Sequence, residues 1–137
     1  MSALLTRPTV ADAMIRFPKT CSRRTTVQQA RALFADGHVH ALLVVERGAL
    51  LAVVERGDLV GHLADAPVQG LGTLRGRTTG PGAELTEVRD AMRAAGRRRI
   101  AVIDDSGNLL GLLCLKRSGA GFCSDAGIRA RAADRRP

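Results

Sequence analysis

An internal repeat constrains the fold of this chain more than any other sequence feature. The segment Thr26–Leu59 matches the segment Glu84–Ser118 at a constant offset of 58 positions, for example between Val44 and Val102. The second copy carries one extra residue in its turn, and the offset is then 59. Because a recurring segment of this length is typically one supersecondary unit, the chain is predicted to contain two copies of the same unit.

The first half of each copy has the pattern of an amphipathic helix. In the first copy, Thr26 followed by Gln29 forms a capping box, so the helix is predicted to begin after Thr26. Gly37 suits the helix exit. Residues three, four and seven positions apart lie on one helical face. The expected apolar face consists of Val27, Ala30, Leu33 and Phe34.

The second half of each copy predicts a β-hairpin. Two apolar runs are separated by Glu46-Arg47-Gly48 in the first copy and by Asp-Asp-Ser-Gly-Asn at 104–108 in the second. The runs are continuously apolar, which indicates that both faces of the sheet are covered. A further helix is expected over 58–64, with a counterpart from Lys116 onward. The predicted fold class is α/β (α+β), with two βαββα-type repeats packed sheet to sheet about a pseudo-twofold axis.

The repeat also predicts the organisation of the chain. The expected parts are a first repeat with its lead-in over 1–65, a linker and second repeat over 66–118, and an Arg/Ala-rich tail over 119–137. The Gly- and Pro-containing segment 65–77 is interpreted as the linker, and the tail as mobile or a short helix. Short leading strands are expected at 19–22 and 77–80.

Charge and composition limit the possible partners. The 137 residues carry a formal charge of +8, which favours polyanions such as nucleic acid or phosphate-bearing ligands. Aromatic residues make up only 2%, so the stacking platforms typical of single-stranded nucleic acid binding are scarce. Nucleic-acid association through the basic surface remains open, and its affinity would fall steeply with salt.

The cysteines indicate a reducing environment, and the hydropathy argues against a membrane segment. Cys21, Cys114 and Cys123 include no C-x-x-C pair, so free thiols are expected instead of a disulfide framework or a zinc site. No apolar run approaches the ~20 residues of a membrane span, and the start lacks a signal-peptide pattern. We expect a cytoplasmic protein without a membrane segment.

The ordered motifs of both copies resemble the CBS-domain family (cystathionine-β-synthase domains), in which a tandem pair forms a Bateman module. A Val-x-x-x-Met lead-in is present at Val10–Met14, and Thr-Val-x-x-Ala begins the helix at Thr26–Ala30. A valine strand, a turn with Gly, and a version of Gly-hydrophobic-hydrophobic-Thr/Ser-x-x-Asp follow. The similarity covers approximately Val10–Ser118.

The resemblance implies a ligand sensor. Members of the family bind AMP, ADP, ATP or S-adenosylmethionine in clefts between the copies, and they commonly form disc-like homodimers. The motif's Asp holds the ribose hydroxyls, its Thr/Ser lies near the phosphate, and basic residues before the valine strand reach the phosphates. No cofactor is required; an adenine nucleotide or S-adenosylmethionine would act as the effector.

The carry-over of these positions is partial. The first copy keeps the Asp as Asp58 but has Glu55 at the Thr/Ser position, whereas the second copy has Cys114 and Arg117 at the two positions. The glycine is Ala52 in the first copy. The resemblance therefore implies at most one competent cleft. The candidate ligand-binding residues are His40, Glu55, Asp58, Arg98, Arg99, Cys114 and Arg117.

Several of these residues have a plainer alternative role. Asp58 can cap the following helix as well as bind ribose. Glu55 can pair with an arginine at the surface; in a cleft it would favour a ligand with little negative charge, such as adenosine or S-adenosylmethionine. The basic run 97–99 can be simply solvated, or can contact phosphate. His38 and His40 lack further metal ligands nearby.

Three functions remain open from the sequence. The first is a non-catalytic regulatory module that binds an adenosyl ligand. The second is a degenerate scaffold that binds an unknown protein partner, and the third is nucleic-acid association. Catalysis is not expected, because no paired acid and base or activated nucleophile can be named.

Overall fold

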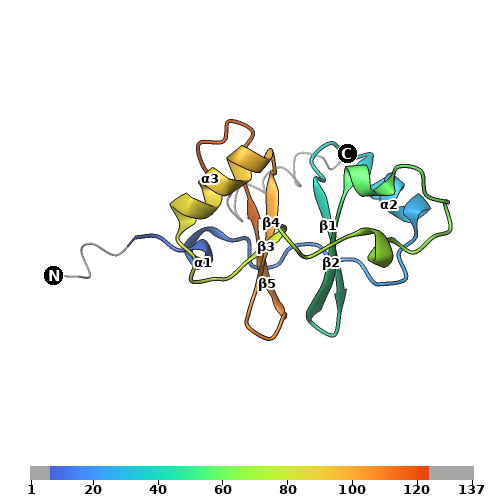
Figure 1. Cartoon of the computed structure of the whole chain (residues 1–137), viewed down its shortest axis with the longest axis horizontal. Helices are drawn as coiled ribbons and strands as arrows, with labels where there is room; N and C mark the ends of the chain where they lie inside the picture. The colour runs from blue at the N-terminus through green and yellow to red at the C-terminus, as the bar shows by residue number, and fades with distance from the viewer. Residues whose placement is uncertain (1–6, 124–137) are drawn as a thin grey trace, which may run out of the picture. The chain divides into compact units, whose positions relative to one another are not determined.

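The computed structural model describes residues 7–123, and the order of its elements follows the repeat. The elements are α1 (Val10–Ala13), α2 (Val27–Phe34), β1 (Ala41–Glu46), β2 (Ala49–Glu55), the 3₁₀ helices η2 (Arg56–Leu59) and η3 (Val68–Leu71), β3 (Thr78–Thr79), α3 (Leu85–Ala95), β4 (Arg99–Ile103) and β5 (Leu109–Cys114). Two sheets are present in the described residues, β1-β2 and β3-β4-β5 (Figure 1). The predicted two-sheet α/β fold is confirmed.

The chain divides into two compact units, each built around one hairpin. The first-copy unit comprises residues 19–78 and 103–109, and the second-copy unit comprises the described residues 7–18, 79–102 and 110–123. The sequence boundaries predicted for the repeats stay a prediction, because these units are assembled from separated segments. Both units lack, within 7–123, any helix that is long and apolar enough to cross a bilayer.

The core of the first-copy unit lies between α2 and the β1-β2 hairpin (Figure 1). Thr26 and Gln29 form the predicted capping box, with the Gln29 amide nitrogen donating to the Thr26 hydroxyl at 3.2 Å. The helix presents Val27, Ala30 and Phe34 to the sheet, but Leu33, expected on the same face, is 45% exposed. The sheet contributes Leu42, Val44, Ala52 and Val54 to this core.

The β1-β2 hairpin closes through the turn that the sequence predicts. Arg47 has φ 52° and Gly48 has φ 84°, as the two central residues of a type I′ turn require. Glu46 pairs with Ala49 beside this turn, and Ala41 pairs with Glu55 at the other end. A register shift between Val44 and Val45 marks a bulge. The hairpin therefore places the end of β2 next to the start of β1.

The second-copy unit repeats this arrangement with α3 packed against the β3-β4-β5 sheet (Figure 1). Its core includes Met92 from α3, Ile100 and Val102 from β4, and Leu113 from β5. The lead-in segment adds Val10, which is fully buried.

The segment that precedes the first repeat packs in the second-copy unit, and the segment that precedes the second repeat packs in the first-copy unit. In the second-copy unit, the Leu85 amide donates to the Pro8 carbonyl at 3.0 Å; in the first-copy unit, the Val27 amide donates to the Ala66 carbonyl at 2.9 Å. Both donors are first-turn amides, which lack partners within their helix. Donors and acceptors differ by the same 58 positions, so the two contacts are equivalent.

Two further local expectations are wrong. The helix expected over 58–64 is only the four-residue η2, and the segment after Lys116 forms a turn and a short return instead of a helix. The segment interpreted as a linker contains η3, whose Val68 is fully buried in the first-copy core. Its burial is long-range packing, which Gly and Pro content does not reveal. Of the predicted tail, residues 124–137 lie outside the described part.

Candidate ligand-binding site

Asp58 lies where β2 passes into η2, at the third position of that 3₁₀ helix. Its Oδ2 atom accepts a hydrogen bond from the Glu55 backbone amide at 2.7 Å. This contact is the reach-back bond of a capping box, so Asp58 supports the helix start from the third position and not as the N-cap residue. The carboxylate is thereby held in one orientation, with 19% of its side chain exposed.

Arg77 binds this carboxylate from the other side. Its Nη1 donates to Asp58 Oδ2 at 2.5 Å, and its Nη2 donates to Asp58 Oδ1 at 3.2 Å. The two bonds make the fork-to-fork geometry that arginine forms with carboxylates. Nη1 also donates to the Val53 carbonyl on β2 at 2.8 Å. With only 12% of its side chain exposed, Arg77 is an integral part of the first-copy unit.

Glu55 completes a three-residue charge cluster with Asp58 and Arg77. Its Oε1 lies 3.3 Å from Arg77 Nη2. The prediction that Glu55 pairs with an arginine is confirmed, although the pair is largely buried and not at the surface. With two carboxylates and one guanidinium, this cluster, hereafter the Asp58 cluster, carries a formal charge of −1.

His40 lies at the same end of the hairpin as the Asp58 cluster. It precedes Ala41, which pairs with Glu55 in the β1-β2 register, and it is half-buried. His38 donates its backbone amide to Asp36 Oδ1 at 2.9 Å in the preceding turn. Among the described residues, no group of three or more His, Cys, Asp or Glu side chains could hold a metal ion.

The other four predicted residues lie in the second-copy unit. Arg98 donates from Nε to the Leu115 carbonyl at 2.8 Å, and the buried Arg99 donates from Nη1 to the Arg98 carbonyl at 3.1 Å. Cys114 is buried at the end of β5, whereas Arg117 is exposed in the turn that follows. Arginine at this position gives the second-copy unit a cation where the first-copy unit has Asp58.

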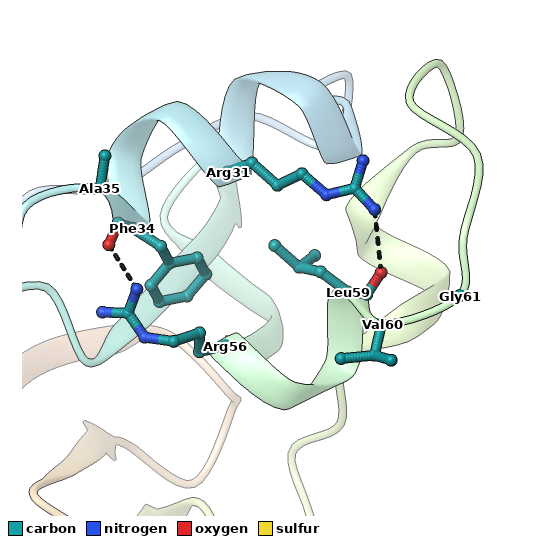
Figure 2. Close-up of a pocket in the computed structure, with 7 residues that line it drawn as sticks. All are labelled: Arg31, Phe34, Ala35, Arg56, Leu59, Val60 and Gly61. Atoms are coloured by element: carbon teal, nitrogen blue, oxygen red, sulfur yellow. Dashed lines mark hydrogen bonds between the residues drawn. The ribbon is translucent and has the colours of Figure 1, made fainter.

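A separate hollow of about 400 Å³ opens between α2 and η2 in the first-copy unit (Figure 2). Two arginines line it: the Arg56 guanidinium donates to the Phe34 carbonyl and lies 5.0 Å from the Phe34 ring centre, and Arg31 donates to the Leu59 carbonyl at 3.5 Å. None of the predicted ligand residues lines this hollow.

Arg77 is the residue that sequence reasoning missed. The sequence puts Arg77 at the end of the segment interpreted as a linker and at the start of a short expected strand, and it indicates no partner for it. The pair joins residues 19 positions apart, so no local pattern marks it. The available signal was chemical: two carboxylates at a strand end need a cation if they are to be buried.

In a comparison with protein families, the sequence model of the CBS domain family matches residues 10–65 and 77–117 of this chain. Two curated relatives are 28% identical over 106 residues: the uncharacterized protein MJ0188 of Methanocaldococcus jannaschii and the inosine-5'-monophosphate dehydrogenase of Nitrosopumilus maritimus. The matches cover 76% and 77% of this chain but only 40% and 22% of the relatives.

Solved CBS-pair structures share the fold. The pair domain of SO5017 from Shewanella oneidensis MR-1 has a TM-score of 0.70 at 23% identity, over 93% of this chain and 73% of that one. The MJ0100 pair, in complex with 5'-methylthioadenosine and S-adenosylmethionine, has 0.63 at 16%, over 96% and 100%. The cytosolic domain of the Mg²⁺ channel MgtE, in complex with ATP, has 0.64 at 17%, over 79% and 46%. With both copies matched across more than half its length, this chain belongs to the CBS-domain family.

Proposed function

We propose that this chain is a non-catalytic regulatory module that binds an adenosyl ligand through the first-copy unit, and that it works as a homodimer. The observation that carries the proposal is Asp58, an oriented carboxylate at the motif position that the family uses for ribose. Related CBS pairs are known in complex with ATP and with S-adenosylmethionine, which supports the ligand class. Light scattering of the purified chain tests the dimer.

The charge of the Asp58 cluster narrows the ligand. Glu55 and Asp58 outnumber Arg77, so a polyphosphate placed near Glu55 would meet net repulsion. A neutral or cationic adenosyl group avoids that cost. We therefore expect adenosine and S-adenosylmethionine to bind more tightly than AMP, and AMP more tightly than ATP.

Arg77 would compete with the ribose hydroxyls for the Asp58 carboxylate. A carboxylate offers about four acceptor positions. Three hydrogen bonds, one from Glu55 and two from Arg77, already occupy Asp58. Two ribose hydroxyls can bind Asp58 only if Arg77 moves at least one of its N–H groups. Ligand binding is therefore expected to be weaker than at an unpaired aspartate.

Thermal unfolding with each ligand tests the proposal. A ligand present at one hundred times its dissociation constant adds about 2.7 kcal/mol to the free energy of unfolding. Asp58→Asn should abolish this shift, whereas Arg75→Gln, an exposed charge in the same segment as Arg77, should leave it unchanged. The absence of any shift with adenosine, S-adenosylmethionine, AMP and ATP at millimolar concentration would contradict the proposal.

A scaffold function is the second candidate, and exposed apolar side chains favour it. Val60 and Leu63, which follow η2, are 78% and 76% exposed, and Leu33 on α2 is exposed as well. Arg117 in place of a motif carboxylate also removes the ribose contact from the second-copy unit. This candidate predicts partner binding that Val60→Ser weakens and that adenosyl ligands do not change; loss of nucleotide binding in Asp58→Asn would argue against it.

A further inference from the structure

Cys114 and Cys123 form a cross-strand pair in the second-copy unit. Cys114 ends β5, the chain turns after Lys116, and the returning segment bridges back to β5 through an antiparallel pair of Leu115 and Phe122. The Cys123 amide donates to the Cys114 carbonyl at 2.7 Å, and the Lys116 amide donates to the Gly121 carbonyl at 2.8 Å. These bonds flank the Leu115–Phe122 bridge, so Cys114 and Cys123 are the next directly opposed residues.

Opposed residues in an antiparallel ladder point to the same face. Both cysteines accordingly contribute to one buried cluster with Ile15, and 2% of Cys114 and 7% of Cys123 are exposed. A hydrogen-bonded opposed pair has its Cα atoms about 5.5 Å apart. Disulfides span Cα separations of about 4.4–6.8 Å. The backbone register therefore brings two thiols, neither of them in a disulfide, within bridging range.

We propose that Cys114 and Cys123 are a reversible disulfide site, an assignment that does not depend on the adenosyl proposal. In ladders the Cβ atoms of such a pair stay about 4.5–5.5 Å apart, whereas a disulfide needs about 3.8 Å. The bridge must draw the two segments together and stores strain. Strained disulfides are the readily reduced ones, so the bond forms under oxidising conditions and reopens with thiol.

The oxidant is a small-molecule disulfide, which reacts with the two cysteines by thiol–disulfide exchange. One cysteine thiolate attacks a sulfur of the oxidant, which forms a mixed disulfide and releases one small thiol. The second cysteine thiolate then displaces the second small thiol and closes the protein disulfide. The two cysteine thiols are oxidised, the small-molecule disulfide is reduced, and the two thiol protons end on the released small thiols.

The disulfide would cross-link the base of the turn that carries Lys116 and Arg117. With both thiols reduced, that turn is held by the Lys116–Gly121 hydrogen bond and by the Gly119 amide, which donates to the Lys116 carbonyl at 2.8 Å. A covalent link across its base would restrict the positions of both exposed cations.

Tryptic mapping of the full chain tests the proposal. Trypsin cuts after Arg99, Lys116 and Arg117, so only a disulfide can join peptide 100–116 to peptide 118–129. After overnight equilibration with excess oxidised glutathione without denaturant, this linked pair should be the dominant oxidised species, at least ten times more abundant than any Cys21 link. Dithiothreitol should return both thiols.

Two single variants identify the partners. Cys21→Ser should keep the link, because Cys21 belongs to the other unit and takes no part in the Cys114–Cys123 pairing. Cys123→Ser should abolish the link. If the unmodified chain yields only a glutathione adduct on one cysteine, or keeps both thiols free for alkylation, the proposal is wrong.

Discussion

Replacement of Arg77 by glutamine tests whether the Asp58 cluster holds the first-copy unit together. The substitution removes the guanidinium that contacts both partly buried carboxylates of the cluster and the Val53 carbonyl. Removal of one partner of a buried ion pair costs about 3–5 kcal/mol. Because 12–25% of these side chains is exposed, we expect the lower end, about 3 kcal/mol.

Urea unfolding followed by far-ultraviolet circular dichroism measures this loss. The sequence has no Trp or Tyr, so intrinsic fluorescence would report little. A loss of about 3 kcal/mol corresponds to a fall of about 10 °C in the melting temperature of a chain of this size. Arg77→Lys keeps the charge but not the planar fork, so it should fall between the wild type and Arg77→Gln.

The matched control is Arg75→Gln, which removes one positive charge from an exposed side chain two residues away. Its effect should stay within about 0.5 kcal/mol. In a double-mutant cycle, Arg77→Gln combined with Asp58→Asn should cost about 1–3 kcal/mol less than the two separate losses together. An Arg77→Gln protein as stable as Arg75→Gln would refute the reasoning, since the cluster would then contribute nothing to the fold.

Two further predictions concern the second hairpin and its surroundings. Gly111→Ala should destabilise the fold by about 1–3 kcal/mol, because the added Cβ would lie 2.6 Å from the Ile15 carbonyl oxygen and 2.8 Å from Met14 Sδ; Gly82→Ala, which meets no atom within 4 Å, is its control in the same melting assay. The pKa of Asp104 is lowered from its ordinary value of 3.8, first by the backbone hydrogen bond from Asn108 and also by bonds from Ser106 and Gly107. Because the pKa is lower in the folded chain, the ionised Asp104 carboxylate stabilises the fold at pH values above 3.8, and this contribution is lost as the pH falls through the lowered pKa. The stability difference between the wild type and Asp104→Ala should therefore shrink on acidification. A carboxyl titration by NMR with a midpoint at or above 3.8 would contradict this.

Much of the local structure could be predicted because its causes lie within a few residues. The capping box of Thr26 and Gln29 starts α2, and Arg47-Gly48 forms the turn of the first hairpin. The full helix expected over 58–64 does not form, because a helix there would need a distant apolar surface to pack against. Only η2 forms there, and Val60 and Leu63 remain exposed, so this part of the segment has no core to pack against.

The candidate site was predictable in its residue types but not in its contacts. Asp58 and Glu55 were identified from their motif positions, and their position at one end of the hairpin follows from the β1-β2 register. The guanidinium that binds both of them comes from a segment that looked like linker. Its burial is favourable only when the carboxylates and the Val53 carbonyl converge on it, which is a property of the folded unit.

The sequence by itself determined that the chain holds two copies of a helix–hairpin unit, where α2 begins and where the first hairpin turns. Capping, turn dihedrals and apolar periodicity act over three or four residues and need no distant partner. Only the tertiary structure decided that residues 7–18 complete the second-copy unit, that Arg77 binds Asp58, and that Cys114 opposes Cys123. Each of these results depends on backbone segments that meet only after the apolar faces have packed, so no local pattern contains them.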